Sequence, residues 1–233
     1  MRRIFLFLSL MILVLFSNSA CAEDFTEFYK RYSPSVVKVE HYDVQKQLWL
    51  HTGSGFVLDD YTVVSAAHVF NWGPKPEQFR LIINGKTYGI RKFWVSQMGV
   101  DVAVMGLNMR TSAPGLRVAM KNPEIGSETF TMGNPMWMQK LFTVGNINQM
   151  ISSIAMGDGP LTVFFNDMIG FSNPVFSGDS GGPVLGRGGQ VYGVVFGGWT
   201  DPLGTPLGPY SIFTPAKTIR ESLGAYRKWA KNF

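Results

Sequence analysis

The chain has 233 residues, of which 45% are hydrophobic and 14% aromatic, with 26 glycines and 13 prolines. This length and apolar content allow one large domain or two small ones, each with a buried core and many turns. The net charge of +5 is too small to indicate a nucleic-acid partner, and no stripe of basic and aromatic residues supports one. With one cysteine, three histidines and no Cys/His cluster, the sequence supports no metal site and no cofactor, and it predicts stability without disulfides.

The first 22 residues have the pattern of a secretory signal peptide. A basic start (residues 2–3) precedes an apolar run (residues 4–16), and Ala20-Cys21-Ala22 fits the small-x-small cleavage pattern. The run is shorter than the roughly 20 residues that a membrane-spanning helix needs. The sequence therefore predicts an exported protein, periplasmic or fully secreted, that starts at Glu23, has a net charge of +3 and keeps no stable membrane span.

Two variants of this export signal stay open. Lipid attachment at Cys21 is less favoured, because Asn18 occupies the place where a bacterial lipoprotein signal carries an aliphatic residue. The pair Arg2-Arg3 resembles a twin-arginine signal, but the very apolar run that follows favours the ordinary secretory route.

After the signal, short apolar and β-branched runs recur between Gly, Pro and Asn turns. A short amphipathic helix is expected over residues 25–32, and Ser33-Pro34 ends it. Many short strands with few helical periods predict an all-β barrel or sandwich. The predicted strands cover residues 36–40, 47–50, 55–58, 61–64, 79–83, 91–95, 102–107, 128–132, 141–144, 161–165, 183–185, 191–196 and 210–213.

The end of the chain and one interior break indicate how these strands are divided. Helical spacing of apolar residues after Pro215 predicts a helix over residues 215–231, packed on the second half. Residues 111–115 read Thr-Ser-Ala-Pro-Gly and separate two halves of comparable strand content. We therefore expect an N-terminal barrel at about 33–112 and a C-terminal barrel at about 116–213.

A serine lies among glycines in the run Phe176-Ser177-Gly178-Asp179-Ser180-Gly181-Gly182. Glycine permits backbone conformations closed to other residues and lets a ligand approach closely, so Ser180 suits an exposed nucleophile. The N–H groups of Gly178 and Ser180 would face the concavity of this turn and stabilise an oxyanion. A plain hairpin turn is the alternative, because Gly, Asp and Ser all favour turns.

A serine nucleophile needs a base and a third group that orients the base. His68 follows a predicted strand, with two small alanines before it, and Asp101 stands at the head of an apolar strand, where a partly buried carboxylate needs a partner. Taken singly, Asp101 could be a strand-edge acid, His68 a core histidine and Ser180 a turn residue. His41 and His51 lie at predicted strand ends without a motif and are interpreted as structural or solvated.

Together these motifs resemble the trypsin-like (chymotrypsin-fold) serine proteases. The order His68, Asp101, Ser180 is theirs, with the contexts Ala-Ala-His, Asp-Val-Ala-Val and Gly-Asp-Ser-Gly-Gly-Pro. The resemblance covers nearly all of residues 23–233 and implies one peptidase domain of two six-stranded antiparallel Greek-key β-barrels with a C-terminal helix. Four further segments look like the bacterial HtrA-type branch, namely residues 33–37, 53–56, 133–135 and 212–215.

The resemblance also implies roles for single residues. Ser180 would be the acyl-forming nucleophile, His68 the base that later acts as acid, and Asp101 the group that orients His68. Gly178 and Ser180 would supply the oxyanion hole, and polypeptides would be the substrates. The substrate pocket would be walled by Pro174, Ser177, Phe196, Gly197, Gly198, Gly208 and Tyr210.

Asp179 and the length of the chain depart from the family patterns. In activated trypsin relatives the acid before the serine pairs with a new N-terminus, but no Ile-Val-Gly-Gly-like segment follows the signal here. Relatives of the HtrA type carry Asn at this place. We therefore expect Asp179 to find another cation or other hydrogen-bond donors, and we expect no propeptide cleavage. Too few residues follow Ser180 for the PDZ domain of HtrA-type chains, so a lone protease domain is expected.

Substrate preference and catalytic competence leave alternatives open. No acid stands near Pro174, at the expected base of the pocket, so an apolar residue before the scissile bond is expected rather than Arg or Lys. The Met-rich residues 132–156 could form a mobile rim over the cleft or fill the second core.

Two other functions compete with a serine endopeptidase. One is a binding protein that keeps the fold without catalysis, and the other is an esterase, although the α/β-hydrolase context is missing. The oligomeric state is not predicted.

Overall fold

Antiparallel strands dominate the described part of the computed structural model, which comprises residues 25–70, 75–97, 99–136, 138–156, 162–200 and 206–232. The predicted signal peptide, with Cys21, lies outside these residues. The helix α2 (Phe25–Tyr32) has the predicted bounds and carries an ion pair between Glu27 and Lys30 of 2.8 Å. It belongs largely to a separate N-terminal unit and is described by itself, while the compact unit begins at Tyr32. Among the described helices, none is both long and apolar enough to cross a membrane.

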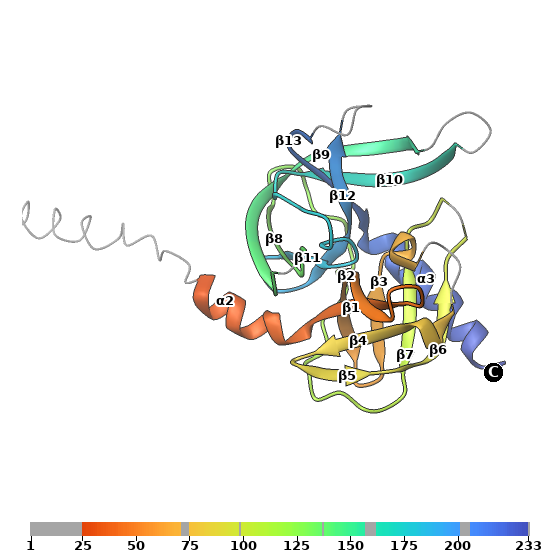
Figure 1. The fold of residues 1–233 in the computed structure, drawn as a ribbon. Helices are drawn as coiled ribbons and strands as arrows, with labels where there is room; N and C mark the ends of the chain where they lie inside the picture. The colour runs from red at the N-terminus through yellow and green to blue at the C-terminus, as the bar shows by residue number, and fades with distance from the viewer. Residues whose placement is uncertain are drawn as a thin grey trace, which may run out of the picture. The chain divides into compact units, whose positions relative to one another are not determined.

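The first sheet holds seven strands in the order β5-β4-β1-β2-β3-β7-β6 (Figure 1). The resemblance implied six strands. The additional strand, β5, arises because Asn84 and Gly85 have positive φ values of 49° and 76°, the geometry of a tight hairpin turn. The strands are β1 (Val36–Asp43), β2 (Leu48–Asp59), β3 (Thr62–Ser65), β4 (Phe79–Ile83), β5 (Lys86–Tyr88), β6 (Ile90–Val95) and β7 (Ala103–Leu107), with short 3-10 helices η1 (Ser33–Ser35), η2 (Ala67–Phe70) and η3 (Pro76–Gln78).

Side-chain alternation explains how these strands sit in the sheet. In β4, Phe79, Leu81 and Ile83 are buried while Arg80 and Ile82 are partly exposed, as expected for a strand with one face on the core. In β7 all five residues are buried, because the strand lies between β3 and β6 and also contacts the C-terminal helix. A strand covered on both faces shows a continuous apolar run instead of alternation.

The second sheet closes into a barrel of six strands in the order β10-β13-β12-β11-β8-β9. The hairpin of β9 and β10 pairs out to Met156 and Val163 (Figure 1). Strand β9 extends far beyond the prediction of residues 141–144, and β10 continues to Phe171 instead of ending at residue 165. The sequence pattern missed this length because exposed polar residues such as Gln149 and Ser152 interrupt the apolar run. The strands are β8 (Glu128–Gly133), β9 (Leu141–Met156), β10 (Val163–Phe171), β11 (Pro183–Gly186), β12 (Val191–Thr200) and β13 (Pro206–Pro215).

The C-terminal helix α3 (Ala216–Ala230) contacts β12 and β13 of the barrel and β7 of the first sheet. It therefore ties the two sheets together, whereas the sequence predicted packing on the second half alone. Pro215 was expected at the first helical position, but its backbone is extended (φ −75°, ψ 162°) and it still pairs with Gly193 in the sheet. The barrel core is formed by Ile147, Ile169, Phe171, Val184, Val195 and Phe213.

Candidate active site

His68 and Asp101 lie side by side at one end of the first sheet. Pairing of β3 with β7 places Ser65 opposite Ala103. The helix η2, which follows β3, and Asp101, two residues before β7, therefore lie at the same edge of the sheet. Both carboxylate oxygens of Asp101 contact His68: Oδ1 accepts the backbone N–H at 2.8 Å, and Oδ2 lies 2.8 Å from Nδ1. The Asp101 side chain is fully buried while 28% of the His68 side chain is exposed. An ionised carboxylate accepts only, so Nδ1 carries the proton and Nε2 keeps a lone pair.

Ser180 lies in a tight turn closed by backbone hydrogen bonds. Asp179 N–H donates to the Phe176 carbonyl and Gly182 N–H to the Asp179 carbonyl, both at 2.9 Å. Gly181 has a φ of 87°, and a side chain there would collide with Ser54 and Ser65, so only glycine fits. The Ser180 side chain is therefore presented by a backbone that other residues could not adopt.

The N–H groups expected to form the oxyanion hole are available to a ligand. Within the described residues, neither Gly178 N–H nor Ser180 N–H has an acceptor. The carbonyl of Ser177 accepts the Met136 N–H at 3.0 Å, and Gly178 has a φ of 101°. This orientation leaves two donors on one turn beside the serine, as a developing oxyanion would need.

Ser54 of β2 connects the nucleophile turn to the first sheet. Its N–H donates to the Ser180 carbonyl and its hydroxyl to the Gly178 carbonyl, both at 2.7 Å. The same hydroxyl accepts the Asn134 N–H at 2.8 Å, and Asn134 Nδ2 donates to the Val37 carbonyl at 3.1 Å. Both residues are buried. The sequence analysis noted their segments only as parts of the resemblance and did not assign them to the site.

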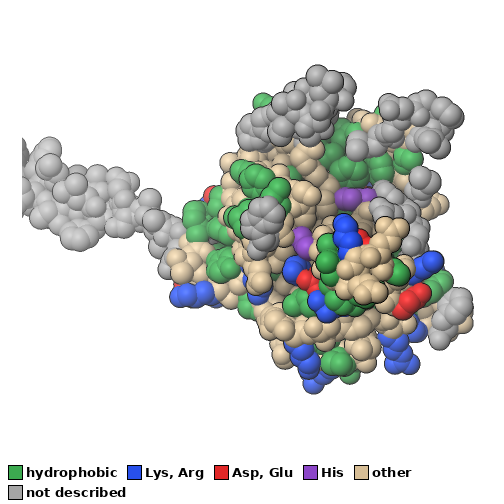
Figure 2. Space-filling model, viewed as in Figure 1, with side chains coloured by type: hydrophobic (Ala, Val, Ile, Leu, Met, Phe, Trp, Pro, Cys, Tyr) green, Lys and Arg blue, Asp and Glu red, His purple; other side chains and the backbone are tan. Residues whose placement is uncertain are grey.

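Phe196 contacts both the serine and the histidine. Ser180 Oγ donates to the Phe196 carbonyl at 3.1 Å, and the Phe196 and His68 rings have centroids 5.3 Å apart. The fold thus brings the three residues expected to form the triad to one place, although His68 and Ser180 are 112 positions apart. Figure 2 shows histidine side chains reaching the surface in a recess of the face that it draws.

Asp179 has hydrogen-bond donors on one side only. Oδ2 accepts the Phe176 N–H at 2.9 Å, whereas Oδ1 is buried with no partner among the described residues. Oδ1 packs directly against Gly133, where any side chain would collide with it. Burial raises the pKa of Asp179 to about 6, and the Phe176 N–H opposes this shift. The expected cation is not found among the described residues, so the carboxyl takes up its proton at a mildly acidic pH.

His51, which the sequence analysis interpreted as structural or solvated, lies against the nucleophile turn. Nδ1 is 3.1 Å from the Val39 carbonyl, while Nε2 is buried beside Gly178, on the side where the Asn134 carbonyl also lies. Burial, followed by the charge of Lys38, lowers the pKa of His51. A neutral imidazole therefore packs beneath the turn. No local motif marks it, because its neighbours come from distant segments.

The residues expected to wall the substrate pocket differ in their exposure and in their neighbours. Pro174, Ser177 and Tyr210 are exposed, and Gly208 lies in β13 with surroundings outside the described residues. Gly197 faces open space. A Cβ at Gly198 would lie 3.8 Å from Val175, which belongs to the predicted wall over residues 172–177. The buried Asn173, next to Pro174, is fixed by three hydrogen bonds. Its Oδ1 accepts the Thr129 hydroxyl, its Nδ2 donates to the Thr143 carbonyl, and its carbonyl accepts the Ser211 hydroxyl.

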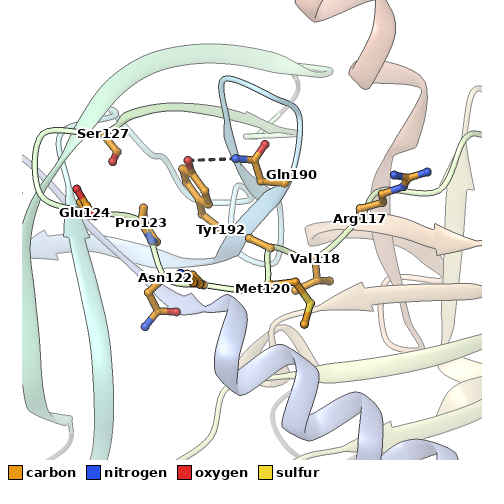
Figure 3. A pocket seen from close by; sticks show the side chains of 11 residues that line it. Arg117, Val118, Met120, Asn122, Pro123, Glu124, Ser127, Gln190 and Tyr192 are labelled. Carbon is orange, nitrogen blue, oxygen red and sulfur yellow. Dashed lines mark hydrogen bonds between the residues drawn. The ribbon is translucent and has the colours of Figure 1, made fainter.

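A separate pocket of about 490 Å³ lies where residues 117–127 connect the two sheets (Figure 3). Gln190 Nε2 donates to the Tyr192 hydroxyl at 3.2 Å within it. The residues that line it include none of those predicted for the active site.

Comparison with known proteins decides the family. Residues 53–194, more than half of the chain, match the trypsin-like peptidase domain. The chain belongs to this family. It is a serine endopeptidase with a chymotrypsin-like fold. No curated protein sequence matches it.

Solved structures agree with this assignment. The active form of the Rv3671c protease from M. tuberculosis superposes with a TM-score of 0.69 at 28% identity, over 82% of this chain and 80% of that one. Its inactive form gives 0.66 at 25% identity, over 83% and 89%. A serine endoprotease from Yersinia pestis shares the fold, with a TM-score of 0.63 at 20% identity over 82% of this chain and 62% of that one. The expected likeness to trypsin-like and HtrA-type proteases is thus confirmed.

Proposed function

We propose that this trypsin-like peptidase is exported and cleaves polypeptides through a Ser180 acyl-enzyme, with His68 as base and Asp101 as the orienting acid. The observation that carries the proposal is the pair of contacts from Asp101 to His68, one to the backbone and one to Nδ1. These contacts hold the imidazole with the proton on Nδ1, so that Nε2 can accept the proton of Ser180. The exported state rests on the signal pattern of residues 1–22.

In the proposed reaction Ser180 Oγ attacks the scissile carbonyl carbon while its proton passes to His68 Nε2. Buried Asp101 stabilises the imidazolium that forms. The N–H groups of Gly178 and Ser180 bind the oxyanion, which needs no rearrangement because both groups are available in the resting turn. Collapse breaks the C–N bond, and Nε2–H protonates the leaving amine. Water then attacks the acyl-enzyme with His68 again as base, and the carboxylate product leaves.

A fluorophosphonate, which labels only an activated serine, tests this mechanism. We expect the protein starting at Glu23 to be labelled, and Ser180→Ala to lose labelling while keeping its thermal unfolding temperature. Asp101→Asn should retain Ser180 but react about 10⁴ times more slowly, because the histidine tautomer is no longer fixed. A folded wild type that is not labelled would instead indicate the binding protein without catalysis. Hydrolysis of esters without cleavage of any peptide in a library would favour the esterase.

The substrate side chain before the scissile bond is proposed to be apolar. Support comes from Val175, a partly buried aliphatic residue that packs on the barrel core and faces Gly198. Profiling on a peptide library should therefore show selection for apolar residues at that position, and selection for Arg or Lys would contradict it. Mass measurement of the exported protein tests the start at Glu23 against a lipid-modified Cys21.

A further inference from the structure

Two phenylalanine rings lie in a row with the His68 imidazole. The Phe196 ring is tilted by 52° against the imidazole at 5.3 Å, and the Phe165 ring meets Phe196 edge-on at 5.0 Å with 67° between the planes. Phe165 comes from β10, Phe196 from β12 and His68 from η2. We call these three residues the aromatic row. It runs from the long hairpin of the second barrel to the base carried by the first sheet.

The aromatic row adds ring contacts to the hydrogen bond of the base. Asp101 holds one edge of the imidazole through Nδ1, and this hydrogen bond by itself does not fix the tilt of the ring plane. The Phe196 ring packs against that plane. Because the carbonyl of Phe196 also accepts the Ser180 hydroxyl, one residue sets the positions of both nucleophile and base. Tilted and edge-on aromatic pairs at these separations are favourable geometries.

Phe165 supports this arrangement from behind. Phe165 is only 3% exposed, and its ring contacts the ring of Phe196. The same strand also reaches the loop that carries Asp101, because the Phe164 carbonyl lies so close to Gly99 that a Cβ there would be 2.8 Å from it. Gly99 has a φ of 88°, which favours glycine. The hairpin therefore contacts both the loop of the acid and the ring that packs on the base.

We propose that Phe165 and Phe196 are positioning residues for His68, and that the β9–β10 hairpin acts through Phe165 to hold the base opposite the nucleophile. This inference rests on the proposed function, since it takes His68 as the base. Phe196 acts by direct contact with His68 and Ser180, and Phe165 acts through Phe196. The hairpin thus supports the catalytic step itself as well as the barrel.

Neighbouring side chains on β10 provide a matched test. Phe165→Ala should lower kcat on a peptide substrate by about tenfold to a hundredfold, the effect of a small misplacement of a catalytic group, with KM within about twofold of wild type. Fluorophosphonate labelling should slow by the same factor. Phe164→Ala, which removes a ring that is 59% exposed, should leave both rates unchanged. If Phe165→Ala fails to fold, Phe165→Leu replaces it, because leucine still fills the site with an apolar side chain. Its kcat should lie between that of the wild type and that expected for the alanine variant.

A double-mutant cycle distinguishes positioning from a general loss of packing. If Phe165 acts through Phe196, then Phe165→Leu should reduce kcat in the wild type but not further in Phe196→Leu. Equal factors in both backgrounds, or a folded Phe165→Leu with wild-type kcat, would overturn the inference while leaving the proposed function in place. A folded wild type that fluorophosphonate does not label would overturn both.

Discussion

Asp179 precedes the proposed nucleophile, and its surroundings differ from what the family pattern implied. Trypsin-like relatives pair this acid with a cation, whereas within the described part of this chain the one donor to its carboxylate is the Phe176 N–H, and the other oxygen packs on Gly133. A buried carboxylate with one donor is costly to ionise. The turn that presents Ser180 therefore contains a group whose protonation state changes at mildly acidic pH.

Asp179→Asn should change the pH dependence of stability. The pKa of Asp179 is raised from 3.8 to about 6, so between these values the unfolded chain has lost the proton that the folded chain keeps. Stability of the wild type should therefore fall as pH rises from 4 to 6, by about 2 kcal/mol if the full shift is expressed. The introduced asparagine does not titrate, so the variant keeps its stability over this range. The difference in free energy of unfolding, variant minus wild type, should therefore increase by about 2 kcal/mol from pH 4 to pH 8. Urea unfolding across this range measures the difference, and parallel curves would contradict it.

Strand β2 shows how one element serves both sheet pairing and the site. It pairs with β1 and β3, and at Ser54 it also donates two hydrogen bonds to the nucleophile turn of the other half. Hydrogen bonds between buried groups constrain geometry strongly because unmade bonds are costly there. The position of the Gly178 N–H therefore depends on a strand that precedes it by more than a hundred residues.

Ser54→Ala should reduce activity more than its effect on stability would suggest. Loss of the hydroxyl leaves the Gly178 carbonyl without this donor and the Asn134 N–H without its acceptor, at a cost of about 1–3 kcal/mol. The freed turn should lower kcat by at least about tenfold, since an oxyanion donor is worth about 10² to 10³ in rate. Thr52→Ala is the control, because among the described residues that hydroxyl donates to the Val39 carbonyl, at 3.4 Å, and not to the nucleophile turn. Equal kcat values for the two variants would refute this role for Ser54.

The two sheets are held together by more than the active site. Helix α3 packs on the barrel and on β7, and Lys92 Nζ of β6 donates to the Ala230 carbonyl at 2.8 Å at the helix end. Ile219 and Leu223 lie on the buried face of this helix. Because the helix bridges both sheets, loss of its packing should destabilise them jointly.

Leu223→Ala should lower the free energy of unfolding by about 2–4 kcal/mol, the usual cost of removing a buried leucine side chain. Calorimetry should show one transition at a lower temperature, since both sheets lose the same support. Arg227→Ala, on the exposed side of the helix, should leave the transition within about 0.5 kcal/mol of wild type. Two separated transitions in Leu223→Ala would show that the helix stabilises only one sheet.

Local patterns in the sequence were enough to predict the all-β class, helix α2, the C-terminal helix to within a residue at each end and the family. The motifs around His68, Asp101 and Ser180 are local, because a tight turn or a strand end needs particular residues next to one another. Tertiary structure decided what no local pattern contains: the length of the β9–β10 hairpin, the place of His51 beneath Gly178, the bonds of Ser54 and the contact of Phe165 with Phe196. The contacts of His51 and Ser54 join residues far apart in the chain and exist because the two sheets pack against each other. The hairpin and the contact of Phe165 with Phe196 instead form within the barrel.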